Sequence, residues 1–436
     1  MSKTKLLGCC FLIPLCAAAQ GPEEWKRVLD RLDRIEQENR ALKEEVHQMR
    51  EQITSARGQP AERMEIQERR VEELAQAKVE SSQRFPVELT GMALFNVFSN
   101  GPNSNGADVP TTASLNSGAM VAGATFRQSV IGLRYRGPQT FLGGRVSGSF
   151  NMDFYDSGTE GSSAPMRIRT ASINLDWKNR SAGFGYEKAI MTPREPNSLM
   201  QLGISPLTGS GNLWRWIPQA RFEQRFSLGE SSKLAAQFAV VQTSEDAGLP
   251  TAQSALAQRR RPGAEGRFEL SHDFGGGRRI EFAPGFHFSD SRVSGNQIPS
   301  QIFTLDWLMA PWSKLEFTGA FFNGQSVHHL GALRQSFTFL PDGRVRGVHS
   351  TGGWGQFSVL ATSRLTLNIF GGVHDDRDAD LSAGRIGRNM SHAANAMYRI
   401  APNVILSFEA LQTRTTYIGS GLRKNNRYGL AVAYLF

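Results

Sequence analysis

The feature that most constrains this chain is a two-residue alternation of apolar and polar side chains that persists from about residue 86 to Phe436. Segments of roughly ten residues carry the alternation, and turn residues separate them, as in β-strands that have one apolar face. We count about sixteen segments, the even number that a closed antiparallel barrel requires. The strands are expected near residues 86–98, 125–136, 140–155, 166–178, 181–188, 218–228, 232–243, 264–273, 278–289, 300–310, 313–323, 351–361, 364–374, 388–400, 403–416 and 425–436.

The connections between these segments alternate between short turns and long polar loops. Residues 137–138, 229–230 and 401–402 are tight turns, whereas residues 189–217 and 324–350 are long loops. Short turns at one rim and long loops at the other are typical of outer-membrane barrels; a soluble multi-sheet β protein is the alternative. Aromatic residues that precede the short turns favour the membrane, because they would form a girdle at one lipid interface. They are Tyr135, Trp177, Phe226, Trp307, Tyr398 and Tyr434.

The last segment shows which face should meet lipid. Tyr428, Leu430, Val432, Tyr434 and Phe436 share one face, and small residues occupy most of the other. We expect the bulky face to point outward. An alternating strand that ends on Phe resembles the insertion signal read by the barrel-assembly machinery, and Tyr434 and Phe436 are its candidate residues.

The first residues indicate export. Residues 1–19 contain Lys3 and Lys5, a short apolar run and the small residues 17–19, which together predict a signal peptide. No later stretch offers 18 consecutive apolar residues, so a helical membrane protein is excluded. The three cysteines all lie in the leader, so the exported chain should rely on no disulfides. They are Cys9, Cys10 and Cys16.

Residues 23–84 predict a coiled-coil stalk in the periplasm. Apolar residues follow three-four spacing from Trp25 to Ile53, with Asn39 on the same seam. Such a seam over four heptads indicates a coiled coil, although a single amphipathic helix is the alternative. The g and e positions would attract in a parallel assembly, for example Glu38 with Lys43. Asn39 is compatible with a dimer or a higher oligomer, so the number of chains stays open.

A signal peptide, a coiled coil, a barrel over residues 85–436 and a final Phe resemble the DcaP-like trimeric porins of Gram-negative outer membranes. The similarity covers nearly the whole exported chain and rests on architecture and on residues 425–436. It implies an all-β transmembrane barrel preceded by an α-helical coiled coil, and assembly as a trimer. It also implies passage of small anionic solutes.

Residues 85–436 hold 29 Arg and 5 Lys against 25 Asp and Glu, an excess of nine positive charges. Parity places several arginines on the face that should line the channel, and the loop 189–217 should fold inward and narrow it. Rings of Arg favour anions in a pore, although these arginines could instead pair with lumen carboxylates such as Glu223 and Glu269. The candidate pore-lining and constriction residues are Arg134, Arg145, Arg194, Glu195, Arg215, Arg221, Arg225 and Arg267.

The predicted function is therefore an outer-membrane porin for small hydrophilic, anionic solutes. A structural tether and a barrel enzyme are the alternatives. The histidines show no metal-ligand spacing, and no catalytic set, cofactor or nucleic-acid partner is predicted. The expected partners are further copies of the chain, outer-membrane lipid, the barrel-assembly machinery and the solutes.

The stalk prediction can be tested with the isolated segment 23–84. Replacing Leu32, Ile35 and Leu42 with Asp would put charge on the apolar seam and should dissociate the assembly. Analytical ultracentrifugation should find an oligomer for the unaltered segment and a monomer for the variant. An unaltered segment that stays monomeric at high concentration would contradict the coiled coil.

Overall fold

The computed structural model describes residues 37, 40–46, 87–155, 165–242, 257–259, 262–293, 295–333 and 335–436. The chain divides into two units, Met1–Ala77 and Lys78–Phe436. In the first unit the described residues are helical, and the side chain of Leu42 is half exposed. No helix among the described residues is both long and apolar enough to cross a membrane. The signal peptide and most of the predicted seam lie outside the described residues, so the coiled coil remains a prediction.

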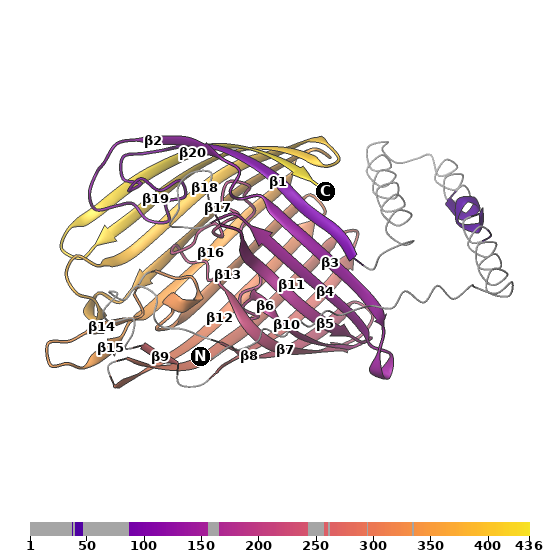
Figure 1. Ribbon diagram of the computed structural model, residues 1–436, viewed down its shortest axis with the longest axis horizontal. Coiled ribbons are helices and arrows are strands. Elements are labelled where there is room, and N and C mark those ends of the chain that lie inside the picture. Colours follow the sequence, from indigo (N-terminus) through magenta and orange to yellow (C-terminus); the bar gives the residue numbers. More distant parts are fainter. Residues whose placement is uncertain are drawn as a thin grey trace, which may run out of the picture. The chain divides into compact units, whose positions relative to one another are not determined.

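The second unit is a large antiparallel β-sheet (Figure 1). Its described strands are β1 (Val87–Asn100), β2 (Val121–Thr125), β3 (Val130–Gln139), β4 (Arg145–Asp153), β5 (Arg167–Asp176), β6 (Arg180–Lys188), β7 (Trp216–Ser227), β8 (Ser232–Val241), β9 (Ala257–Arg259), β10 (Gly263–Gly275), β11 (Arg278–Val293), β12 (Asn296–Trp312), β13 (Leu315–Gln325), β16 (His349–Leu360), β17 (Leu365–Asp376), β18 (Ile386–Ala401), β19 (Val404–Tyr417) and β20 (Gly421–Leu435). A separate hairpin joins β14 (Phe337–Phe339) to β15 (Val345–Gly347).

The sheet closes on itself because the first strand pairs with the last. Met92–Asn100 of β1 align with residues 435–427 of β20. On its other edge, β1 pairs with β3 through residues 87–92. The short strand β2 pairs with the same edge of β1 as β3 does, so the two share one position in the barrel. In the same way, β9 and β10 share one position beside β11. The described strands therefore occupy sixteen positions in a closed antiparallel barrel, which confirms the predicted number.

The two strands β11 and β12 differ from the expectation in length. The predicted strands 278–289 and 300–310 leave residues 290–299 as a polar loop, but β11 reaches Val293 and β12 begins at Asn296. Polarity indicates contact with water and does not by itself end a strand. Here the ladder continues through the pairs Asp290–Pro299 and Arg292–Gln297, so the hairpin extends beyond the apolar band.

The outer face of the barrel is apolar and the inner face is polar. In β20 the side chains of Tyr428, Leu430, Val432 and Tyr434 are exposed, as is that of Phe436 directly after the strand, while those of the alternate residues are largely buried. The same parity holds in β7, where Phe222 and Phe226 are exposed on the outside. Cross-strand aromatic pairs reinforce the outer face, such as Phe317 with Phe357, whose stacked rings lie 4.6 Å apart. The bulky face thus points outward, as the sequence predicted.

Phe436 helps to close the barrel, and this role generates a prediction. Its carbonyl accepts a hydrogen bond from the Gly91 amide at 2.8 Å, and its amide donates to the Gly91 carbonyl at 3.1 Å. A Cβ added at Gly91 would lie only 2.7 Å from the Phe436 ring, so glycine leaves room for that ring. Deleting Phe436 should remove both hydrogen bonds and leave part of the β1 edge unpaired, which favours misassembly.

We expect the amount of folded protein in the outer-membrane fraction to fall several-fold when Phe436 is deleted. Phe436→Tyr keeps the backbone pairing and the ring, and should assemble normally. A normal yield of the shortened chain would contradict this role.

Candidate functional site

The inside of the barrel is crossed by the segment between β6 and β7, residues 189–215. Its backbone and side chains contact inward-facing residues on strands around the wall. The Met191 carbonyl accepts from the Thr304 hydroxyl on β12 at 3.0 Å, and the Asn197 carbonyl accepts from the Asn395 amide on β18 at 2.7 Å. The Leu199 carbonyl accepts from the Asn96 amide of β1 at 2.8 Å. The segment therefore lies within the lumen and reduces its cross-section.

An ion network fastens this segment to the inner face of β10–β12. The Arg194 guanidinium donates to Asp306 at 2.7 Å and to Glu281 at 2.6 Å. Arg267 donates to the same Asp306 at 2.7 Å and to Glu269 at 2.6 Å. Asp306 and Arg267 are almost fully buried. Arg194 and Arg267 are thus neutralised by carboxylates, and they act as anchors of the segment.

Glu195, the next residue of the segment, is a carboxylate that lies beside cations. Its carboxylate is 2.7 Å from the Lys188 ammonium and accepts from the Ser205 hydroxyl at 2.6 Å. Although burial opposes ionisation, Lys188, Ser205 and the nearby Arg169 together hold the pKa of Glu195 below its usual value. Glu195 is therefore an ionised carboxylate that Lys188 partly neutralises.

Next to Glu195, a group of arginines packs against aromatic rings. Arg167 and Arg169 on β5 both pair with Asp153 of β4, at 2.6 and 3.2 Å. The Arg169 guanidinium lies 4.7 Å from the centroid of the Trp216 ring, which is a favourable cation–π distance. Arg169 also donates to the Leu202 carbonyl, and Arg167 donates to that of Gly203 at 2.6 Å. These contacts attach the inserted segment to the β4–β5 side of the wall.

The strands β3–β7 carry several lumen-facing cations that remain in contact with water. Arg134, Arg145, Arg221 and Arg225 all lie on the face opposite the exposed apolar side chains of their strands. Arg215, at the end of the inserted segment, is also exposed. The structure thus brings five of the predicted site residues to a solvated interior, and separates them from the buried anchors Arg194 and Arg267.

In the ion pairs on this side of the wall the guanidinium is more exposed than its carboxylate. The Arg136 side chain is 69% exposed and that of Glu88 is 31%. The values are 37% and 21% for Arg221 and Glu187, and 43% and 23% for Arg225 and Glu223. Pairing is therefore real but incomplete, and the positive partner faces the solvent. Both alternatives from the sequence, structural pairing and a cationic lining, are present in the same residues.

The inner face of β10–β13 has the opposite composition. Its carboxylates outnumber its guanidinium groups, and several are engaged by the inserted segment. The carboxylates are Glu265, Glu269, Asp273, Glu281, Asp306 and Glu316, and the cations are Arg267 and Arg279. Charge is thus separated across the lumen, with the cationic side on β3–β7.

A cluster of buried polar groups joins the inserted segment to the loop after β13. The His287 ring lies between the Glu265 carboxylate at 3.0 Å and the Ser289 hydroxyl at 2.9 Å. His329 of the loop approaches His287 at 3.3 Å, and Glu265 also accepts from the Ile190 amide at 3.0 Å. The sequence showed only scattered histidines, because partners on different strands cannot be paired from spacing. The cluster acts here as an anchor for two segments.

His328 begins a 3₁₀ turn in this loop (His328–Leu330). Its Nδ1–H donates to the Leu333 carbonyl at 2.7 Å. The Leu330 carbonyl accepts from the amides of Trp214 at 3.0 Å and Arg215 at 3.3 Å, so the turn holds the end of the inserted segment. Burial lowers the pKa of His328 to about 4, and the positive charge of Arg215 adds to this effect.

The depressed pKa predicts that acid loosens this contact. Between pH 6.5 and about 4 an opened loop binds a proton at His328 that the packed loop does not, so packing becomes less stable as pH falls through this window. The full effect is about 2 to 3 kcal/mol. Hydrogen exchange at the Trp214 and Arg215 amides should accelerate on acidification, after correction for intrinsic rates.

His328→Asn serves as the matched variant, because an amide can still donate to Leu333 but does not titrate. Its exchange should be independent of pH in this range. Equal acceleration in the variant would show that another group controls the loop.

Several residues of the inner wall were not among the predicted site residues. Asp306 shares the inward parity that identified the others, so the pattern could have found its direction. Arg167 and Arg169 do not share it, because a β-bulge at Arg169 reverses the parity of β5. Their partners could not be found, because Arg194 and Asp306 are separated by 112 positions. Arg136 lies on the same face of β3 as Arg134, so the same parity would identify it.

Comparison with known proteins supports the architecture. No protein-family model and no curated protein sequence matches the chain. Among solved structures, the outer membrane channel DcaP of Acinetobacter baumannii is similar with a TM-score of 0.65 and 17% identity, over 80% of this chain and 97% of that one. An anion-selective porin from Comamonas acidovorans has a TM-score of 0.52 and 12% identity, over 80% and 99%. The resemblance to DcaP-like porins that the sequence indicated is confirmed in the fold, which is that of a sixteen-strand porin barrel.

Proposed function

We propose that this protein is an outer-membrane porin through which small hydrophilic solutes diffuse, with a preference for anions. The apolar outer face and polar inner face suit a barrel that crosses a bilayer and encloses water. The inserted segment 189–215 would form the constriction, as loops do that fold into porin barrels. Residues 1–19 would be a signal peptide, and residues 23–84 a periplasmic stalk that helps hold a trimer together.

The observation that carries the anion preference is the unequal exposure within ion pairs. Arg136, Arg221 and Arg225 face the lumen more openly than Glu88, Glu187 and Glu223. A passing solute would therefore meet guanidinium groups before it meets carboxylates. Guanidinium groups donate in pairs to carboxylate or phosphate oxygens, so organic acids are the expected class of solute.

The inserted segment keeps this cationic side open. Arg194 turns toward the acidic side of the wall, where it contacts Asp306 and Glu281. The segment thereby neutralises carboxylates that would otherwise attract cations, and it leaves Arg221 and Arg225 in contact with water. Since the segment contacts β5 at Arg167 and Arg169, the remaining lumen would lie beyond that contact, beside the parts of the wall that carry Arg221 and Arg225.

Ion selectivity tests this proposal. The full chain should form channels in a planar bilayer, and the reversal potential under a KCl gradient should have the sign that favours chloride. Replacing Arg221 and Arg225 with Ser leaves Glu187 and Glu223 without these partners, so the potential should move to zero or change sign. The preference should also shrink between 0.1 and 1 M salt, because the Debye length falls from about 10 to about 3 Å.

The matched control replaces Arg278 and Arg364 with Ser. Both are exposed at short turns outside the lumen, so the net charge changes equally and selectivity should not. A cation-favouring wild type would mean that the lumen carboxylates dominate. A membrane-inserted protein without conductance would refute the porin function itself.

A further inference from the structure

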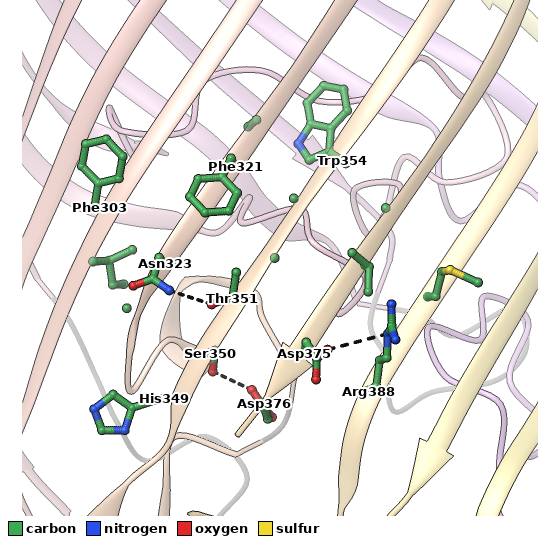
Figure 2. A pocket seen from close by; sticks show the side chains of 18 of the residues that line it. Phe303, Phe321, Asn323, His349, Ser350, Thr351, Trp354, Asp375, Asp376 and Arg388 are labelled. Atoms are coloured by element: carbon green, nitrogen blue, oxygen red, sulfur yellow. Dashed lines mark hydrogen bonds and ion pairs between the residues drawn. The ribbon is translucent and has the colours of Figure 1, made fainter. Parts of the chain in front are cut away.

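A groove of about 1400 Å³ lies on the outer face of the barrel over strands β11–β13 and β16–β18. Its lining includes the exposed rings of Phe303 and Phe321 and the outward-facing positions Val373 and Met390. Figure 2 shows Phe303 and Phe321 on one side of the groove and Arg388 on the other. Most of the lining residues have outward parity, so the groove opens on the outer face, although inward-facing residues such as Trp354 and Asp376 also contribute to its lining.

Glycines produce the depression. Gly319, Gly355 and Gly371 are aligned cross-strand partners on β13, β16 and β17, and all three have the outward parity of their strands. Gly353 lies two positions further along the same face. The Trp307 ring covers Gly319, whereas Gly353, Gly355 and Gly371 line the groove with backbone alone. This leaves space for long apolar groups between Phe321 and Met390.

One edge of the groove carries positive charge on the outer face. Arg388 of β18 lines the groove and lies 3.8 Å from Asp375. On the next strands Arg414 is the cross-strand partner of Met390, and Lys424 is the partner of Arg414. No carboxylate among the described residues pairs with Arg414 or Lys424 within 4.0 Å, whereas the guanidinium of Arg414 donates to the Gln412 side chain at 2.6 Å.

The direct pairing of Arg414 with Lys424 needs an explanation. Like charges on opposed residues of neighbouring strands destabilise a sheet, and an anion bound between them would relieve the repulsion. Arg414 lies nearer to the long-loop rim than Phe408 of the same strand, and Lys424 lies nearer to it than Tyr428. Both cations therefore lie just beyond the exposed apolar side chains. At this level a membrane protein meets lipid headgroups.

We propose that this face is a binding site for a phosphorylated, acylated lipid of the outer leaflet. Its phosphate contacts Arg388, Arg414 and Lys424, and an acyl chain lies in the groove over Gly355 and Gly371 against Phe321. Charge complementarity selects this occupant over a neutral lipid. Of the three cations, only Arg388 forms an ion pair with a described carboxylate, that of Asp375, and this excess of positive charge selects an anionic lipid over a second copy of the positively charged barrel. The inference rests on the proposed position in an outer membrane and not on conduction.

The test measures binding of bis-phosphorylated lipid A to the purified full chain in a neutral detergent. The variant Arg388→Gln, Arg414→Gln, Lys424→Gln should bind roughly 100-fold more weakly, because each cation near an anionic lipid contributes about fivefold. The control changes three cations at the short-turn rim, Arg278→Gln, Lys314→Gln and Arg364→Gln, and should bind like wild type. Lipid A without phosphates should bind wild type as weakly as intact lipid A binds the first variant.

A second variant tests the groove while it keeps every charge. A Cβ at Gly355 would meet nothing nearer than 3.4 Å, whereas one at Gly353 would lie 2.7 Å from the Ala320 carbonyl. Gly355→Leu therefore fills the groove without backbone strain and should weaken binding at least several-fold. Unchanged binding in this variant, or full displacement of lipid A by equimolar inorganic phosphate, would overturn the acyl part of the site.

Equal binding by wild type and the triple Gln variant would overturn the proposal. So would a triple variant that loses its oligomeric state in ultracentrifugation but keeps lipid binding, since the face would then be an interface between copies. Conductance measured on the same samples separates these outcomes from a failure of the porin function, because lipid binding in detergent requires no ion flow.

Discussion

In the proposed bilayer a backbone amide or carbonyl that faces hydrocarbon would have no water to bond with, so the wall of this barrel would have to satisfy its own hydrogen bonds. Pairing of β1 with β20 removes the two free edges, and the last pair joins Phe436 to Gly91. Once the sheet is closed, alternation sends one set of side chains outward and the other inward. The separation of apolar and charged residues follows from this single requirement.

Charge inside the closed wall then serves two different purposes. The buried pair of Arg267 and Asp306 has lost its hydration, a cost that only close and multiple hydrogen bonds offset, and it fixes Arg194 and the inserted segment. Arg221 and Arg225 keep much of their contact with water, so their pairs are weaker and their field reaches the lumen. Position in the wall, more than residue type, decides which arginines are anchors.

The outer face of the barrel departs from its apolar pattern at one place. Most outward positions carry bulky apolar side chains, yet Gly319, Gly355 and Gly371 align across three strands, and Arg414 faces Lys424 beside them. Neither feature is needed to close the barrel or to form the inner wall. At this one place the outer face lacks bulky side chains and also carries positive charge. The proposed amphipathic lipid accounts for both features.

The sequence by itself determined the strand number, the alternation of short and long connections, and the direction of residues such as Arg134, Arg221 and Tyr434, because these depend on a local period of two. It did not determine that β11 and β12 extend through polar residues to Val293 and from Asn296, since polarity does not end a strand. Only the tertiary structure decided which arginine meets which carboxylate. Arg194 and Asp306 are far apart in the chain, and only barrel closure with the segment folded inside brings them together.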